Sequence, residues 1–421
     1  MSTPSPKLLV VLPSSPSAVT KDVMAGIRQA WDDSLFPKNA IVWARELSDV
    51  VRGKSLEPAE LSKSLSEDLP STQPLFSEWG VLLSHLTIQD VRWVLFLGGK
   101  TEARMAWELS ELASECGSEV CVGLIPDDYT NSLGATDHCL GFASFARSYC
   151  DFVAGDDLDN QSYFKGVKLI LAPGFENGWA AAAAGLAAEL HSARNTIPDA
   201  GPHLIYVPEA EFSQEIFCRD VNESLEKYGR STVVVSKALI KKIPELEFEA
   251  GSAALAGLRL SEFLVASLRA SGDSCRELSD AKIKASTCNF RGRSFLKRAT
   301  PVDSAEAFRV GVESLNALVK SRASGFMMSL KRTAKDEYES DLVSVEIQTA
   351  LFNERSLPAA MVPQGNEVIT QEFLAYILPL IGMDSPNQNA SNFSFSAAIS
   401  AAVRRVSGFA RSRHLHRGPD L

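Results

Sequence analysis

Short apolar runs alternate with longer segments of near-helical apolar spacing along most of the chain. Apolar runs of this length that end in turn-forming residues are typical of buried strands, and the segments between them are typical of amphipathic helices. The pattern predicts strands at residues 7–12, 120–124, 167–172, 204–207 and 232–235, and helices at 18–31, 102–116, 179–192 and 214–228. Residues 41–51 are predicted to form a strand followed by the start of a helix. Residues 55–73 are predicted to form a surface loop with some helix. The segments 76–86 and 90–96 are predicted to lead into a Gly-Gly turn. Such alternation predicts a parallel sheet covered by helices on both faces.

The size and charge of the chain narrow its class. With 421 residues it is long enough for two domains with sizeable cores. A net charge of −10 disfavours nucleic acid or an anionic membrane as the partner. No apolar run approaches the length of about 18 residues that a membrane helix needs. The run at residues 8–12 is also too short for a signal peptide, so a cytoplasmic location is expected.

The cysteines do not form a disulfide or zinc pattern. They are seven in number and lack CxxC spacing, which is typical of reduced cytosolic thiols. His138 and Cys139 are adjacent, but the six histidines are scattered and no second ligand pair has metal spacing. We therefore expect structural roles for this pair and no metal site.

Two strand-to-loop junctions carry the strongest functional signal. The predicted strand ending near residue 96 runs into Gly98 and Gly99, and a helix follows. The strand at 120–124 opens the stretch 124–147, which begins with Pro126 and turn-forming polar residues and closes in a helical pattern. Open α/β sheets build phosphate-binding crevices at such carboxyl edges. These two loops are the first candidates for a ligand site.

A colinear set of landmarks over residues 8–383 resembles the phosphofructokinase family, most closely its long, pyrophosphate-dependent branch. No single motif is decisive, but their order is specific. The matching positions are Gly98 and Gly99, Pro126, Asn131, Thr136 and Asp137, Gly141 and Phe142, Gly174, Gly178 and Trp179, Pro208 and Glu209, Tyr228 and Gly229, Arg293 and Asp303, and the closing helix at 371–382.

The resemblance implies a fold of two doubly wound parallel-sheet α/β halves with a crevice between them. The donor-phosphate half is expected to comprise residues 1–150 plus helices at about 294–345. The sugar-phosphate half is expected to comprise 151–293 plus a closing segment at about 346–384. Members of the family assemble as dimers or tetramers, so the resemblance also implies a homo-oligomer, or a hetero-oligomer with an active phosphofructokinase.

The chain departs from the family at the positions that would carry catalysis. The resemblance places Lys100 where the family has a metal-binding aspartate, Thr130 where it has the catalytic base, and Ser132 where it has the partner aspartate. A threonine hydroxyl is no base near neutral pH, and an ammonium disfavours Mg²⁺. The donor-phosphate loops are altered as well: Ser14 and Ser15 replace glycines, and Asp127 and Asp128 replace a lysine and a threonine. Side chains on Ser14 and Ser15 obstruct the close approach of backbone amides to a phosphate.

Some positions of the sugar-phosphate side persist. The resemblance makes Gly174, Glu209, Lys284, Phe290 and Arg293 the candidate residues that bind a sugar phosphate. Arg293 also belongs to a basic run that could be a solvated face or a subunit contact, and Phe290 alone could be a packing residue. The segment 385–421 lacks acidic residues up to Pro419 and contains five arginines, which is typical of a disordered or partner-binding tail.

Three functions follow as hypotheses. The first is a phosphofructokinase-like protein without catalysis, acting as a regulatory or structural subunit or as a sugar-phosphate-binding pseudoenzyme, with no cofactor. The second is an active pyrophosphate- or ATP-dependent 6-phosphofructokinase with a rebuilt site, which would need Mg²⁺; in it Lys100 would replace the metal, and Asp127 or Asp128 the base. The third is an interaction protein that works through its basic tail.

Overall fold

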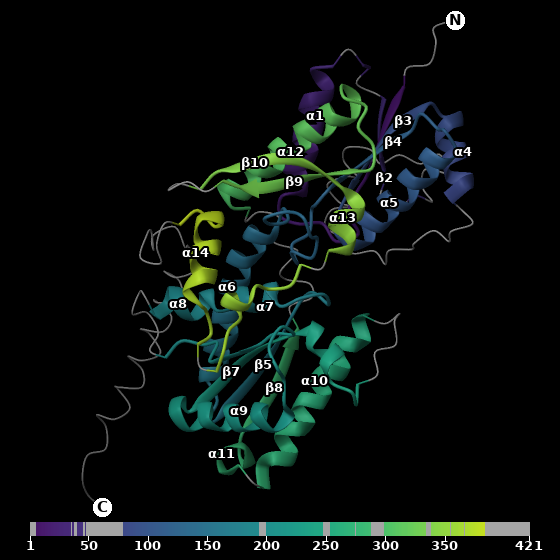
Figure 1. Ribbon diagram of the computed structural model, residues 1–421. Coiled ribbons are helices and arrows are strands. Elements are labelled where there is room, and N and C mark those ends of the chain that lie inside the picture. Colours follow the sequence, from purple (N-terminus) through teal and green to yellow (C-terminus); the bar gives the residue numbers. More distant parts are fainter. Residues whose placement is uncertain are drawn as a thin grey trace, which may run out of the picture.

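The computed structural model describes most of the chain between residues 6 and 383. The described residues are 6–34, 36–37, 40–44, 47, 79–192, 199–246, 253–273, 275–287, 299–333, 338–353, 355–365 and 367–383. Two lobes form the molecule, each built around one sheet (Figure 1). The predicted loop at 55–73 and the predicted tail at 385–421 lie outside the described residues.

A six-stranded sheet forms the first lobe, with strand order β10-β9-β4-β3-β1-β2. The strands are β1 (Lys7–Val11), β2 (Ile41–Ala44), β3 (Val91–Leu97), β4 (Cys121–Ile125), β9 (Phe326–Arg332) and β10 (Ser340–Glu346). All neighbouring pairs are parallel except β9 and β10. One face packs against α4 (Trp79–Ile88), α5 (Lys100–Glu115) and α13 (Ile347–Phe352), and the other against α1 (Thr20–Asp32) and α12 (Pro301–Val319).

A four-stranded parallel sheet forms the second lobe, with strand order β6-β7-β5-β8. Its strands are β5 (Gly166–Ala172), β6 (Leu204–Tyr206), β7 (Arg230–Ser236) and β8 (Lys282–Thr287). One face packs against α6 (Phe142–Gln161), α7 (Trp179–Ala183), α8 (Leu186–Ser192) and α14 (Gln371–Leu380). The other face packs against α9 (Gln214–Tyr228), α10 (Ala253–Ala270) and α11 (Arg276–Ser279).

The predicted fold class, mixed α/β with parallel sheets and helices on both faces, is confirmed. Helix α9 has the predicted bounds, and the predicted strands that are described lie within two residues of β1, β4, β5, β6 and β7. The single helix predicted at 179–192 is wrong, because the structure has two helices separated at Ala184 and Gly185. A Cβ atom on Gly185 would lie 2.3 Å from the carbonyl oxygen of Val368, so the later segment crosses the chain where the helix breaks.

The chain crosses between the two lobes more than once, as the position of its later helices and strands shows. Helix α12 and strands β9 and β10 pack in the first lobe, and α14 packs in the second. Helix α6 runs without interruption through residue 150, where the boundary was expected, and it packs in the core of the second lobe. Strands β8, β9 and β10 were not predicted from the apolar pattern.

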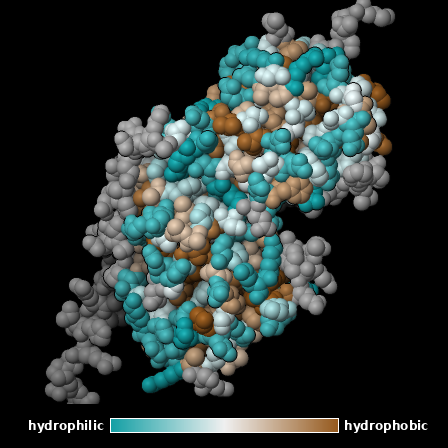
Figure 2. Space-filling model, viewed as in Figure 1, coloured by the Kyte–Doolittle hydropathy of each residue, from teal (hydrophilic) through white to brown (hydrophobic). Residues whose placement is uncertain are grey.

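The face shown in Figure 2 is largely hydrophilic over both lobes, with hydrophobic residues scattered among polar ones. Within the described ranges, no helix is both long enough and apolar enough to cross a membrane.

Candidate functional site

The loops that follow the carboxyl ends of the parallel strands converge between the two lobes. From the first lobe come residues 12–19 after β1, 98–99 after β3 and 126–140 after β4. From the second lobe come residues 173–178 after β5, 207–213 after β6 and 237–242 after β7. Open α/β sheets bind their ligands at this edge. These loops, called the crevice below, are therefore where a ligand is expected to bind.

The carboxylate of Glu102 occupies the two donor-phosphate loops. It accepts hydrogen bonds from the backbone N–H of Ser14 at 2.9 Å and of Gly99 at 3.1 Å, and the side chain is 3% exposed. Gly98 has φ +151°, and a Cβ atom there would lie 2.4 Å from the Glu102 carboxyl carbon. Burial raises the pKa of this carboxyl, against the lowering effect of these hydrogen bonds. Two of the backbone amides to which the resemblance assigns a donor phosphate are therefore already bonded to an internal carboxyl group.

Asp128 holds the central loop together. One carboxylate oxygen accepts from the backbone N–H of Thr130 at 3.0 Å and from its hydroxyl at 2.7 Å. The other oxygen accepts from the backbone N–H of Ser132 at 2.8 Å and from its hydroxyl at 2.6 Å. The Asp128 carboxylate thus holds in place Thr130 and Ser132, the two positions where the resemblance implies aspartates.

Asp127 is the exception among the carboxylates of this loop. It is 1% exposed, and its Oδ2 atom accepts from the Thr20 hydroxyl at the start of α1. Its Oδ1 atom is buried and has no hydrogen-bond partner within the described part of the chain. Burial and the nearby carboxylates of Asp303 and Asp128 raise the pKa of Asp127 to about 7, although hydrogen bonds from Ser17 and Thr20 oppose this. This group can therefore exchange a proton near neutral pH.

Lys100 does not face a metal site but pairs with the opposite lobe. Its ammonium lies 3.0 Å from the Oε2 atom of Glu176, on the loop between β5 and α7. Lys241, which follows β7, lies 3.6 Å from the same oxygen. Burial opposes the charge of Glu176, but the two ammonium groups outweigh it and lower the pKa of this carboxyl.

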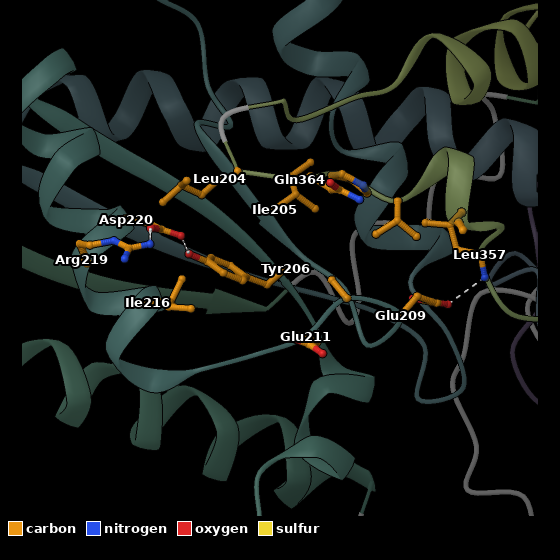
Figure 3. A pocket seen from close by; sticks show the side chains of 15 residues that line it. Leu204, Ile205, Tyr206, Glu209, Glu211, Ile216, Arg219, Asp220, Leu357 and Gln364 are labelled. Carbon is orange, nitrogen blue, oxygen red and sulfur yellow. Dashed lines mark hydrogen bonds and ion pairs between the residues drawn. The ribbon is translucent and has the colours of Figure 1, made fainter.

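Glu209 lies at the end of a groove in the second lobe (Figure 3). Its Oε1 atom accepts from the backbone N–H of Gly178 at 3.0 Å and of Leu357 at 2.9 Å. The groove has a volume of about 660 Å³ and runs between β6, the start of α9 and residues 357–365. Tyr206 lines it and donates to Asp220 at 3.1 Å. No residue of the first-lobe loops at 12–19, 98–99 and 126–140 lines this groove, whereas Glu209 and Glu211 of the loop after β6 do.

The remaining predicted residues are not brought together. Gly174 lies beside the central loop, because a Cβ atom on it would lie 3.5 Å from Cβ of Thr130. Lys284 lies within β8 opposite Lys168, several residues before the carboxyl edge, and its ammonium contacts the Tyr163 hydroxyl. Phe290 and Arg293 lie outside the described residues. The predicted sugar-phosphate role of these residues stays a prediction.

Several residues of the site were missed by sequence reasoning. Glu102 follows Gly99 by three residues, which is the spacing of a capping box and could have been recognised. Glu176 sits in an ordinary turn, and no sequence signal distinguishes it. Asp303, noted only as a landmark, caps α6 by accepting from the backbone N–H of Gly141 at 2.9 Å and of Ser144 at 3.0 Å.

The position that the resemblance assigns to a metal ligand does not fit a magnesium ion. Mg²⁺ is bound through carboxylates together with substrate phosphates. At the position where the resemblance implies a metal-binding aspartate, the chain presents the ammonium of Lys100, and this group is already paired with Glu176. Among the residues with described positions, no group of three or more His, Cys, Asp or Glu side chains could hold a metal ion. No step through a metal is therefore derived.

Comparisons with known proteins agree with the architecture. The family described as Phosphofructokinase matches residues 71–318. A pyrophosphate–fructose 6-phosphate 1-phosphotransferase of Rhodospirillum rubrum is 27% identical over 331 residues, covering 76% of each chain. A sulfofructose kinase of Alkalicoccus urumqiensis is 26% identical over 313 residues, covering 74% of this chain and 77% of the relative.

Solved structures share the fold. A pyrophosphate-dependent phosphofructokinase from Marinobacter aquaeolei superimposes with a TM-score of 0.69 at 20% identity, covering 90% of this chain and 92% of that one. A second, from Nitrosospira multiformis, gives a TM-score of 0.70 at 18% identity with the same coverage. With more than half of the sequence matched by the family and the two-lobed fold in common, the chain belongs to the phosphofructokinase family.

Proposed function

We propose that this protein is a non-catalytic member of the family, which keeps the scaffold as a regulatory or structural subunit and binds a sugar phosphate in the crevice. One observation carries the proposal: the Glu102 carboxyl group accepts from the backbone N–H groups of Ser14 and Gly99, so these two amides are not available to a donor phosphate. The loss of a carboxylate at Lys100 and the commitment of Asp128 to its loop support the same conclusion.

The first prediction is the absence of phosphoryl transfer. The full-length protein is mixed with fructose 6-phosphate and Mg²⁺, with pyrophosphate or ATP as donor, in a coupled assay. Because the donor loops are closed and the base position is a hydroxyl, we expect no turnover above background. Sulfofructose is included as a second acceptor because of the sulfofructose kinase relative. The enzyme of Rhodospirillum rubrum serves as the positive control. Turnover of about 1 s⁻¹ or more, within the ordinary enzymatic range, would contradict the proposal.

The second candidate function is an active phosphotransferase, and Asp127 is the observation in its favour. A buried carboxyl with an unpaired oxygen and a pKa of about 7 has the properties of a general base. The relatives named as phosphotransferases at 26–27% identity are also consistent with this function. If turnover were found, Asp127→Asn would separate the two cases. A base would lose about 10²–10⁴-fold in rate, whereas a carboxyl without a catalytic role would not.

The second prediction concerns assembly. A protein that is retained for its scaffold acts through its surfaces, and we propose a homo-oligomer or a mixed oligomer with an active phosphofructokinase. Light scattering at micromolar concentration should give at least the mass of a dimer, and a tagged copy should co-purify with a phosphofructokinase from its native cells. A monomer that retains no such partner would contradict the proposal. It would also favour the third hypothesis, in which the basic segment 385–421 is the working part.

A further inference from the structure

Lysine side chains from both lobes lie on the loops and helix ends that border the crevice. Lys100 begins α5 in the first lobe, while Lys237 and Lys241 lie on η3 (Lys237–Lys242), directly after β7 in the second lobe. Lys237 is 4% exposed, and its ammonium lies 5.7 Å from the centre of the Phe175 ring. Lysines that reach the same point from both lobes can attract an anion together.

Glu176 forms ion pairs with two of these lysines, Lys100 and Lys241. The distances from its Oε2 atom are 3.0 Å to Lys100 and 3.6 Å to Lys241, so one carboxylate oxygen is shared by cations from both lobes. Two other carboxylates of the crevice are already hydrogen-bonded, because Asp128 accepts from Thr130 and Ser132 of its own loop and Glu209 accepts from Gly178 and Leu357. Among the described residues, Glu176 is the carboxylate within ion-pair distance of Lys100 and Lys241.

The ion pairs of Glu176 are of the kind that a stronger anion can displace. The side chains of Lys100, Glu176 and Lys241 are 26%, 42% and 45% exposed, and ion pairs this accessible to water contribute little to stability. A phosphoryl dianion carries twice the charge of a carboxylate and offers three acceptor oxygens, so it forms stronger charge-assisted hydrogen bonds with the same ammonium groups.

We propose that Lys100 and Lys241 form a binding site for the phosphoryl group of a sugar phosphate, and that Glu176 occupies this site when the ligand is absent. The ligand displaces the Glu176 carboxylate and takes its place between the two lobes. The inference rests on the proposed function, since it identifies the residues with which a crevice without phosphoryl transfer would hold its ligand. It also gives Lys100 a role as a ligand-binding cation at the position where the family resemblance implies a metal-binding carboxylate.

Calorimetric titration of the full-length protein tests the proposal. Fructose 6-phosphate and inorganic phosphate are titrated separately at low salt, so that a sugar phosphate can be distinguished from a free anion. Glu176→Gln removes the competing charge and should tighten binding of fructose 6-phosphate by about 10-fold. Lys100→Met and Lys241→Met each remove one cation and should weaken it by about 10-fold. Each of these changes corresponds to about 1.4 kcal/mol.

Two matched controls exclude a general effect of charge. Lys242→Met removes the same charge from the neighbouring exposed residue and should leave the affinity unchanged. Glu277→Gln breaks another ion pair of the second lobe, to Lys165 at 2.8 Å, and should also leave it unchanged. Thermal unfolding of every variant shows that the fold is retained.

The affinities of the variants for fructose 6-phosphate, compared with one another, test the proposed site. Equal affinities of Lys241→Met and Lys242→Met, or no tightening in Glu176→Gln, would overturn the inference, and so would the absence of binding. If inorganic phosphate binds as tightly as fructose 6-phosphate, the sugar phosphate is overturned as the ligand. Turnover in the assay of the first prediction would contradict the proposed function without altering this pattern, so the two failures are distinguishable.

Discussion

Replacing His138 with glutamine is expected to lower the free energy of unfolding by about 3–5 kcal/mol near pH 6, since breaking a buried ion pair costs this much. The imidazole is fully buried between two carboxylates, with Nε2 2.9 Å from Glu306 and Nδ1 3.1 Å from Asp137. Burial opposes the charge on this ring, but the hydrogen bonds with Asp137 and Glu306 outweigh it and raise the pKa of His138 to about 9. Glutamine would leave the buried Glu306 carboxylate without its cation.

The ion pairs of His138 also predict how the stability of the protein depends on pH. The pKa of His138 is higher in the folded state than the unfolded value of 6.5, so its contribution to stability is complete below pH 6.5. It is lost as the pH rises through about 9. A shift of this size corresponds to about 3 kcal/mol. Chemical denaturation between pH 6 and pH 10 should therefore show a decline in the wild type that is absent in His138→Gln.

His85→Gln is the control for this substitution, because His85 is a half-buried residue in the last turn of α4 and contacts neither carboxylate. Its stability and pH profile should match those of the wild type. A stability decline of equal slope in His138→Gln and the wild type would show that His138 does not carry the charge assigned to it.

Replacing Gly26 with alanine is expected to cost about 3 kcal/mol of unfolding free energy, at the upper end of the range for overpacking. Helices α1 and α12 meet with their backbones in close approach. A Cβ atom on Gly26 would lie 2.2 Å from the Phe308 carbonyl oxygen, and one on Gly311 would lie 2.4 Å from that of Val23. The obstructing atoms belong to the backbone, so a whole helix must move to make room.

Gly155→Ala in α6 is the matched control for Gly26→Ala. No atom lies within 4 Å of the position that its Cβ would take. It should gain about 0.5–1 kcal/mol from the higher helix propensity of alanine. Denaturant unfolding of both variants should thus give changes of opposite sign. A neutral Gly26→Ala would show that the two helices have room to separate.

The two-lobed fold could be predicted because its central strands are fully buried and therefore continuously apolar. Strand β5 has every residue buried, and the apolar pattern placed it within one residue. Strand β8, in contrast, is an edge strand with lysines at alternate positions, and β10 is an edge strand that exposes most of its residues. These two edge strands lack the continuous apolar signal of the central ones, so they were missed.

The sequence predicted which loops form the candidate site, but it did not predict the contacts between their side chains. Its loops follow strands that the pattern located, which placed Gly98, Asp127 and Thr130 at one edge. The contacts that close the crevice join residues far apart in sequence: Ser14 with Glu102, and Lys100 with Glu176. No local periodicity encodes such pairs, because they form only when segments distant in sequence pack together in the folded chain.

Helix α14 has a consequence for the order of folding during synthesis. Its Phe373 and Tyr376 pack on Trp179, and the same core includes Phe142 of α6. A growing chain that has not yet added residues 371–380 leaves the apolar faces of α6 and α7 uncovered, although most of the second lobe has already been made. The first lobe likewise lacks β9 and β10 until residues 326–346 are added. Neither lobe can therefore complete its core early, and nascent chains should depend on chaperones until the last helix is available.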